Sequence, residues 1–564
     1  MKKLKALLAA CLALTLLVGC SSGGGDKEAK TTGNKYLQNA NIRKALAYAV
    51  NTKELTDDVL KDGSVPARGF MPSKFAYGPD KKDYAETADN YMEYNLEKAQ
   101  EFFDKGLEEL GEKEITLRFL YEKTDPANTA ADYIYGELSK IKGLNIQMEG
   151  VDQKNARTQK QSDRDFDITL TRWGPDYADP TTYLALMTNY DKAHFFNYGD
   201  YNNDKYDELV TQISEEKDLA KRWQLCKDAE AILFQDGEYP VVPLFQTGGA
   251  MLVKENVKGL EVHTFGTPYI YKNVKKTSGD KTLVVAKENG IESLDLLKAS
   301  SGMDFEVINA YSEGLMALDK DGQAVPGLAE SYKKSDDGLV YTFKIRQNAK
   351  WANGDPVTAH DFVYSWKRTL ENGEEYQYFF TDDMASIKGG SDIYNAITND
   401  KEYNIDDLGV KAIDDKTLEV TLSKPIPYFL SLTAFPTAFP MNEKFVKSVE
   451  DSGKVYGADA DSVLACGPFK LTNYVQDNVF ELAKNDTYWD AKNVNLDGIT
   501  MKIIKTVSTA EQAFVANEVE IAKINSSLVD KYKDKPVYDS ALEGYLWFLQ
   551  FNIDSKGAEA AKAE

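Results

Sequence analysis

The chain has few of the residues from which catalytic and metal sites are built. Its 564 residues include only three histidines, His194, His263 and His360, which lie far apart in the sequence. No HExxH, P-loop, GxGxxG or GxSxG pattern accompanies them. We therefore expect no enzymatic activity, no metal and no cofactor.

Cysteine is also too scarce to form a disulfide scaffold. Cys11 and Cys20 lie in an apolar N-terminal segment, which leaves only Cys226 and Cys466 in the body of the chain. These two lack the spacing of a metal site. The sequence leaves open whether they pair with each other.

Positive charge and long apolar runs are limited. The 67 basic residues are outnumbered by 90 acidic ones, for a formal net charge of −23. Nucleic-acid binding is not expected, because it relies on clustered Lys and Arg. After the first twenty residues no apolar run reaches the roughly 20 residues of a membrane span. With 42% hydrophobic residues, the chain can form two or three soluble domains.

The first twenty residues have the layout of a secretory leader. Lysines precede an apolar core at 6–18, which is too short to span a bilayer. The core ends in LVGC at 17–20, which resembles the lipobox of bacterial lipoproteins. We expect a signal peptide over 1–20, lipidation of Cys20 and a location on the outer face of the cell membrane. A plain signal peptide is the alternative.

The rest of the chain shows mixed α and β patterns. Residues 21–35 have the composition of a flexible spacer, and 556–564 form a polar, alanine-rich tail. The acidic stretch at 200–207 lacks the glycine and final glutamate of a calcium loop, so we interpret it as a solvated loop. Periodicity predicts helices at 41–50, 95–110, 129–141, 205–213, 222–234 and 359–370. It predicts strands at 114–120, 144–151, 241–245, 282–287, 340–345 and 417–422.

Several motifs in the second half resemble one protein family. They are 327–332 (GLAESY), 341–346 (YTFKIR), 350–368 (KWANGDPVTAHDFVYSWKR), 425–430 (PIPYFL), 466–470 (CGPFK) and 485–489 (NDTYW). Together with 41–51, 166–183 and 239–245, they are similar to the peptide and nickel class (family 5) of extracytoplasmic solute-binding proteins. Within it they most resemble the oligopeptide-binding lipoproteins of ABC importers. The resemblance covers nearly all of residues 36–555.

The order of the two halves departs from that family. In the relatives, the strand that resembles 282–287 follows the lipobox, and the segment that resembles 36–270 comes last. Here the segment 36–270 precedes the strand 282–287. We therefore expect a circular permutation that joins the old termini at 275–281 and opens new ones after Ser555. The alternatives are a rearrangement that does not fold and a misassembled gene.

The resemblance implies an α/β fold with two lobes that close on a ligand. This is the periplasmic-binding-protein-like, or Venus flytrap, fold, with an extra inserted domain. Residues 36–244 plus 546–555 would form the peptide-binding lobe, 245–318 plus 431–545 the second lobe, and 319–430 the insert. The chain would cross between lobes near Leu244 and Phe245 and near 545–547, which makes these segments hinge candidates.

The resemblance also implies a set of binding residues. The aspartate that matches Asp176 pairs with the ligand's α-ammonium in peptide-binding relatives, and the residues before it offer backbone groups to an extended peptide. Arg172, Trp173 and Gly174 would therefore contact the ligand, with Trp173 walling a side-chain pocket. Asp179 is expected to cap the turn before Pro180. The opposite wall is expected to include Ser300, Ser301, Gly302, Tyr376 and Trp547, with Ser300 in place of the relatives' acidic residue.

The function implied is that of a monomeric, lipid-anchored binding component. It would capture oligopeptides in extended form and deliver them to the permease of an ABC importer. A metal chelate or haem as the ligand, or a surface adhesin or chaperone-like role, are the alternatives. The nearby basic residues Lys123, Lys154, Arg157 and Lys160 match no carboxylate-binding residue of the relatives, so peptide length and preference stay open.

Overall fold

The computed structural model describes residues 34–553, apart from 190–195 and the single positions 236, 375 and 383. The leader, Cys20, nearly all of the spacer and the polar tail lie outside the described residues. Within the described ranges, no helix combines the length and apolar character that a membrane crossing requires.

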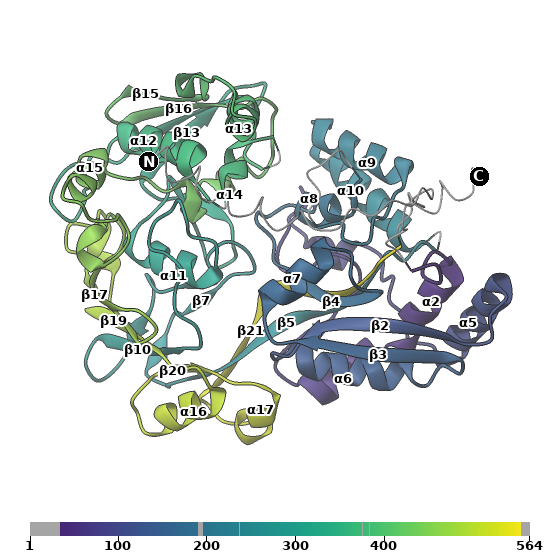
Figure 1. The fold of residues 1–564 in the computed structure, drawn as a ribbon. Helices are drawn as coiled ribbons and strands as arrows, with labels where there is room; N and C mark the ends of the chain where they lie inside the picture. The colour runs from purple at the N-terminus through teal and green to yellow at the C-terminus, as the bar shows by residue number, and fades with distance from the viewer. Residues whose placement is uncertain (1–33, 190–195, 236, 375, 383, 554–564) are drawn as a thin grey trace, which may run out of the picture.

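A mixed 11-stranded sheet runs through both lobes (Figure 1). Its order is β17-β18-β19-β10-β20-β5-β21-β4-β2-β3, and β1 pairs with β5. The strands are β1 (Val65–Pro66), β2 (Ile115–Glu122), β3 (Leu144–Val151), β4 (Ile168–Trp173), β5 (Val241–Val253), β10 (Thr282–Lys287), β17 (Phe469–Val475), β18 (Val479–Lys484), β19 (Gly498–Ile503), β20 (Ile521–Lys523) and β21 (Tyr538–Phe551). The long strands β5 and β21 belong to both halves.

The first lobe is built on β2, β3, β4 and one end of β5 and β21. One buried cluster contains side chains from Leu37 to Phe245 and from Leu546 to Ile553. Its helices are α2 (Ala40–Ala49), α3 (Thr52–Glu54), α4 (Tyr84–Thr87), α5 (Leu96–Leu110), α6 (Ala127–Leu138), α7 (Lys154–Ser162), α8 (Thr181–Leu184), α9 (Asp204–Glu215) and α10 (Leu219–Phe234), with a π-helical turn at Leu55–Leu60. Asparagine or aspartate side chains cap several of them, such as Asn95 on α5 and Asn203 on α9.

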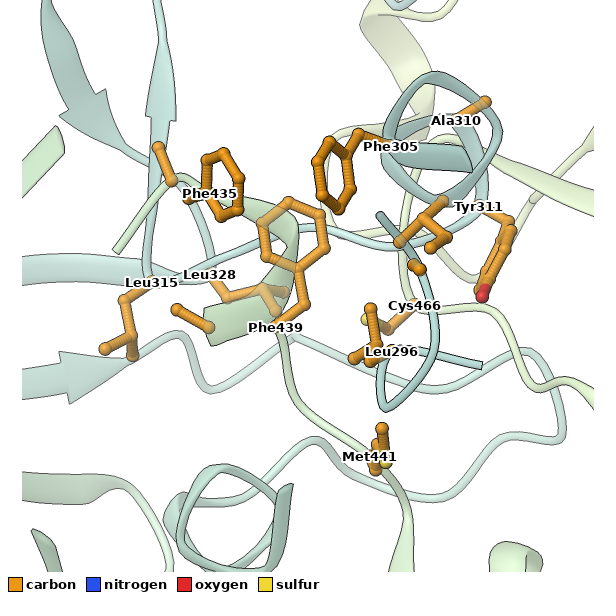
Figure 2. Close-up of a cluster of buried hydrophobic side chains, with 14 of the residues drawn as sticks. Leu296, Phe305, Ala310, Tyr311, Leu315, Leu328, Phe435, Phe439, Met441 and Cys466 are labelled. Atoms are coloured by element: carbon orange, nitrogen blue, oxygen red, sulfur yellow. The ribbon is translucent and has the colours of Figure 1, made fainter. Parts of the chain in front are cut away.

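The second lobe shares one core with the inserted domain. The lobe contributes α11 (Gly302–Tyr311), α15 (Glu443–Asp451), α16 (Val507–Val515) and α17 (Ser526–Tyr532). The insert has a four-stranded sheet, β13 (Ala329–Lys334), β14 (Val340–Ile345), β16 (Thr417–Thr421) and β15 (Val410–Asp414) in spatial order, with α12 (Ala359–Asn372), α13 (Gly390–Thr398) and α14 (Phe429–Leu432). Figure 2 shows part of the common core, where Phe305 and Tyr311 of α11 lie near Phe435, Phe439 and Cys466.

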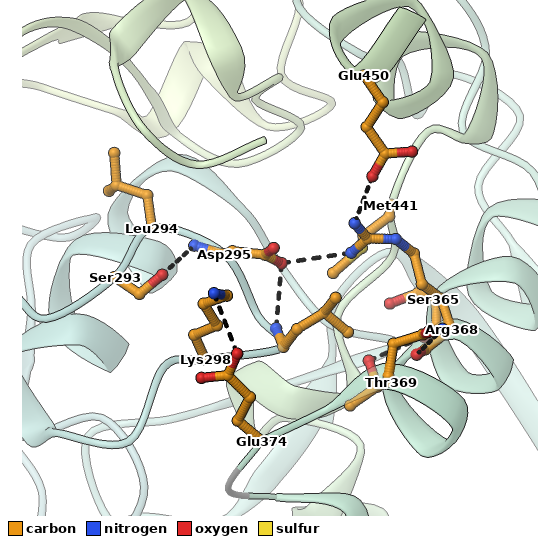
Figure 3. A network of polar contacts seen from close by, with 12 residues as sticks. Ser293, Leu294, Asp295, Lys298, Ser365, Arg368, Thr369, Glu374, Met441 and Glu450 are labelled. Carbon is orange, nitrogen blue, oxygen red and sulfur yellow. Dashed lines mark hydrogen bonds and ion pairs between the residues drawn. The ribbon is translucent and has the colours of Figure 1, made fainter. Parts of the chain in front are cut away.

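A polar network also fastens the insert to the second lobe (Figure 3). Arg368 on α12 lies 3.4 Å from Asp295 and 2.8 Å from Glu450 on α15. The side chains of Arg368 and Asp295 are only 13% and 6% exposed. Together with the common core, this network makes the insert and the second lobe one body.

The two lobes are joined where β5 and β21 pass between them. Residues 241–246 of β5 pair with one end of β21 and residues 248–252 with the other, and the register shifts between Leu542 and Leu546. At Gly544, within this irregularity, a Cβ atom would lie 1.5 Å from the carbonyl oxygen of Thr264. Only glycine fits there. The irregularity lies close to the crossings expected from the sequence.

The segment expected to join the old termini is short and ordered. Strand β9 (Lys275–Lys276) pairs with β6 (Val257–Lys258), and β10 begins at Thr282, whose N–H donates to Asp280 at 2.9 Å. At the other end of the molecule, the N–H of Asn34 donates to the carbonyl of Asn552 at 3.3 Å. The two ends of the described chain are therefore adjacent.

Most predicted elements are present, with differences at their ends. The strands at 144–151, 282–287 and 340–345 have the predicted bounds. Strand β5 was predicted to end at Phe245 but continues to Val253, and α10 begins at Leu219 rather than Arg222 because Asp218 caps it. Cys226 and Cys466 are buried, free thiols in different cores, so they do not pair.

Replacing Arg368 by methionine should destabilise the protein by about 3 kcal/mol, because it leaves Asp295 buried without its cation while keeping the apolar stem. Glu450→Gln is the matched control. The Glu450 side chain is 48% exposed, so its loss should cost about 1 kcal/mol or less. Thermal unfolding measures both variants, and equal effects would contradict the role given to the buried pair.

Candidate functional site

A cavity of about 860 Å³ lies between the two lobes, beside the strands that join them. All predicted contact residues except Trp547 line it. The first lobe contributes Arg172, Trp173, Gly174 and Asp176, and the other side contributes Ser300, Ser301, Gly302 and Tyr376. The structure thus brings together residues that are far apart in the sequence.

Asp176 follows β4 and has an unusual carboxylate. Its backbone N–H donates to Thr182 Oγ1 at 3.2 Å, but within the described residues its carboxylate accepts no hydrogen bond and forms no ion pair. The side chain keeps partial exposure because it lines the cavity, while protein surrounds its other sides. Burial raises the pKa of Asp176 to about 7. An uncompensated carboxylate of this kind favours a cation in the cavity.

The turn that carries Asp176 is anchored by a buried ion pair. Both oxygens of Asp179 bind the Arg222 guanidinium, at 2.6 and 2.8 Å, and both residues are at most 5% exposed. Asp179 also accepts the N–H of Thr181 at 3.1 Å, but the N-cap position of α8 is Pro180. The hydrogen bond from Thr181 agrees with the expected capping of the turn before Pro180, although Asp179 is not the N-cap residue of α8. Its main partner is Arg222, which sequence reasoning did not identify.

Ser300 and Ser301 have local structural partners. Ser301 caps α11, because its hydroxyl accepts the N–H of Asp304 at 3.1 Å. The hydroxyl of Ser300 donates to Glu292 at 2.9 Å, and Glu292 also lines the cavity. An acidic side chain therefore stands at this wall, although Ser300 itself is not acidic.

Trp547 lies outside the cavity lining. Its ring is 3% exposed, its Nε1–H donates to Thr247 Oγ1 at 2.9 Å, and it stacks on Phe245 with ring centres 5.9 Å apart. Tyr545 takes its place in the lining. The guanidinium of Arg172 lies 4.8 Å from the Tyr545 ring centre and 5.0 Å from that of Trp547. Trp547 thus supports Arg172 and is removed from the candidate contact residues.

Two ion pairs in the cavity wall were missed by sequence reasoning. Lys287 lies 2.5 Å from Glu306, which also accepts the Tyr271 hydroxyl at 2.5 Å. Lys523 pairs with Glu543. Burial lowers the pKa of Lys287. For Glu543, burial acts to raise the pKa, but the charge of Lys523 outweighs it and the pKa is lowered. These residues stand singly at strand ends, on an α-helix or in the β21 irregularity, so no motif marks them.

Basic side chains reach another part of the cavity. Lys154 and Arg157 of α7 line it, and Arg157 donates to Thr171 Oγ1 at 2.5 Å and Gln161 Oε1 at 3.0 Å. Lys123 pairs with Asp152 and Lys160 with Glu149 and Asp165, and neither lysine lines the cavity. Arg157 also lies 3.5 Å from Glu122, so of the two α7 cations it is already paired. Among the described residues, the cavity presents the carboxylate of Asp176 without a partner and, apart from it, these basic groups.

The family model for bacterial extracellular solute-binding proteins, family 5 (Middle), matches residues 27–195 and 323–562, which is more than half of the chain. The chain belongs to this family. Its members are solute-binding proteins that act outside the cytoplasm, and the fold class is mixed α/β.

Individual relatives match over only part of their length. The chain is 38% identical over 279 residues to a dipeptide-binding protein, DppE, of Bacillus subtilis, covering 50% of this chain and 49% of the relative. It is 36% identical over 289 residues to the oligopeptide-binding protein OppA of the same organism, covering 50% and 51%. A solved structure of Listeria monocytogenes OppA bound to peptide is 39% identical, covers 46% of this chain and 49% of that one, and gives a TM-score of 0.43. The chain thus spans about half the length of the relatives it matches.

Asp176→Asn should raise stability at pH 8 by up to about 4 kcal/mol. The unfolded state loses the carboxyl proton of Asp176 near pH 4, whereas the folded state keeps it until about pH 7, because burial favours the protonated carboxyl. The free energy of unfolding therefore falls between about pH 4 and about pH 7, and the full cost is present at pH 8. This cost decreases as the pH falls and vanishes below about pH 4. Calorimetric unfolding from pH 4 to 8 measures the difference. A variant that is less stable than the parent at pH 8 would contradict the assignment.

Proposed function

We propose that this protein captures oligopeptides in extended form between its lobes, with the peptide's α-ammonium bound to Asp176. The observation that carries the proposal is the carboxylate of Asp176, which faces the cavity without a partner among the described residues. An ammonium group supplies the missing charge and hydrogen-bond donors. Every peptide with a free N-terminus has this group, so one residue serves many ligands.

The end of β4 suits main-chain recognition. Arg172, Trp173 and Gly174 lie along the cavity between the strand and Asp176. A Cβ atom at position 174 would lie 2.7 Å from the Tyr545 ring, so glycine permits the close packing there. Hydrogen bonds between the backbone here and the backbone of an extended peptide would not depend on the ligand's side chains. Ser300, Ser301, Gly302 and Tyr376 form the facing wall.

The remaining wall favours tolerance of different side chains. Lys287 and Lys523 are neutralised by Glu306 and Glu543, so neither pair requires a ligand of one sign. The cavity volume of about 860 Å³ lies within the usual range for ligand sites. Water can fill the space that a small side chain leaves, at low cost. We ascribe no covalent chemistry to the site.

We also propose that the chain is a circular permutation of the family's usual order. The adjacency of Asn34 and Asn552 fits new termini opened between neighbouring points, and the short connection from β9 to β10 fits a joint at 275–281. Coverage of about half of each relative is what a permuted chain gives when alignment keeps chain order. The peptide-binding lobe would then be 36–244 plus 546–555, the second lobe 245–318 plus 431–545, and the insert 319–430.

Membrane attachment and delivery complete the proposal. Cys20 would carry the lipid that holds a monomer at the outer face of the membrane, with 21–35 as a spacer. The bound peptide would pass to the permease of an ABC importer. The names of the relatives, dipeptide-binding and oligopeptide-binding proteins, support a peptide over a metal chelate or haem.

Asp176→Asn should weaken the binding of a peptide with a free N-terminus by about 1.5 to 3 kcal/mol, because the charged partner of the ammonium is lost. Asp163→Asn is the matched control, since Asp163 is exposed and lies outside the cavity lining. Calorimetric titration with free and N-acetylated forms of one peptide measures the effect. Equal affinity of the parent for both forms would refute the ammonium role.

A rearranged chain that runs from Thr282 to Ile553, continues directly into Asn34 and ends at Lys281 should fold and bind the same peptides. Its contacts are those of the present chain, and only the connections at two surface positions change. Melting temperature and peptide affinity measure the outcome. Failure of this chain to fold, alongside a folded parent, would count against the permutation.

A further inference from the structure

An aromatic contact also joins the two lobes, away from the strands that connect them. Tyr177, the residue after Asp176, stacks on Tyr428, with ring centres 4.2 Å apart and planes 10° from parallel. In Figure 1, α8 and α14 mark this region at the facing edges of the lobes, whereas β5 and β21 join the lobes lower in the view. Neither tyrosine lines the cavity.

The two rings come from different bodies. Tyr428 packs against the core that the second lobe shares with the insert. Tyr177 belongs to the first lobe by sequence, yet its side chain is 6% exposed and buried in that same core. Among the described residues between 34 and 245, it is the one side chain assigned to that core, while Tyr183 and Leu184 belong to the first lobe's core.

The first lobe holds Tyr177 firmly on its own side. The buried pair of Asp179 and Arg222 fixes the turn two residues further on, and Thr181 donates a hydrogen bond to the Tyr177 hydroxyl at 3.3 Å. Asp176 is its immediate neighbour, anchored through Thr182. The ring that crosses to the second lobe and the carboxylate that faces the cavity therefore share one short, fixed segment.

We propose that Tyr177 and Tyr428 form a latch that holds the lobes closed over the ligand and couples closure to ammonium capture. The inference rests on the proposed peptide binding. Because Asp176 and Tyr177 share one fixed segment, closure of the lobes docks the Tyr177 ring on Tyr428 and at the same time encloses the ammonium held by Asp176, so both contacts favour the same closed state. The docked rings in turn slow the opening of the lobes and the release of the peptide. Both tyrosines are positioning residues, since neither lines the ligand cavity.

The test compares Tyr428→Ala with Tyr428→Phe. Alanine removes the stack, whereas phenylalanine keeps the ring and loses only the hydroxyl. We expect Tyr428→Ala to release peptide about tenfold faster, with an almost unchanged association rate. Tyr428→Phe should stay within about twofold of the parent. Stopped-flow tryptophan fluorescence with a peptide of free N-terminus separates the two rates.

Small-angle X-ray scattering gives a readout that needs no peptide binding. We expect the radius of gyration of Tyr428→Ala to exceed that of Tyr428→Phe, because the lobes separate when the stack is lost. If Tyr428→Ala does not fold, Tyr428→Leu replaces it, since leucine fills the space without stacking.

The outcomes separate the latch from the peptide-binding function. Equal release rates and equal radii for the alanine and phenylalanine variants overturn the latch, while a parent protein that binds peptide leaves the function standing. If the parent binds no peptide, the proposed function fails, and the scattering comparison still decides whether the stack holds the lobes together. A lower melting temperature with unchanged release and radius marks a structural role and also overturns the latch.

Discussion

The site depends on one partly exposed carboxylate that has no counter-charge among the described residues. Asp176 lies in a cavity wall where burial raises its pKa to about 7, and its backbone is fixed by Thr182 and by the neighbouring pair of Asp179 and Arg222. Folding therefore places a charge where it is unfavourable, and the surrounding contacts offset that cost. A cation bound beside Asp176 would offset this electrostatic cost directly. In the proposed function, affinity for an ammonium group and reduced stability of the ligand-free protein would have the same physical origin.

The two-lobed arrangement explains how such a site can be both enclosed and accessible. Each lobe has its own core, and the insert is fused to the second lobe through a common core and Arg368. The lobes are joined through β5 and β21, whose pairing is interrupted where Gly544 approaches Thr264. A few residues can thus absorb a rotation while both cores stay intact. The Tyr177 and Tyr428 rings stack at a distance from that joint, so in the proposed latch a small contact there opposes rotation of the lobes about the joint.

Much of the local structure could be predicted from the sequence, because it depends on local patterns. The alternation of residues 282–287 and 340–345 predicted strands with the observed bounds. Asp176 was proposed through the resemblance of residues 172–183 to peptide-binding relatives, and it lies in the cavity wall. The predicted strand at 241–245 is shorter than β5, because Gly248 and Gly249 interrupt the apolar pattern. Trp547 was assigned to the cavity because segment 545–551 borders the cleft in relatives. Sequence alone does not reveal the register shift before Trp547, which sets its surroundings. Lys287, Lys523 and Glu543 become partners of the site only when distant strands meet, so no single segment reveals them.

The central claim is that the Asp176 carboxyl group is partly protonated near neutral pH in the free protein and binds a ligand ammonium. The most direct measurement is the pKa of Asp176 by carbon NMR of aspartate-labelled protein, assigned by comparison with Asp176→Asn and recorded with and without peptide. A value near 7 in the free protein that falls by about two units or more when a peptide with a free N-terminus binds is the expected result. A value near 4 in the free protein, or one that the peptide does not change, would contradict the claim.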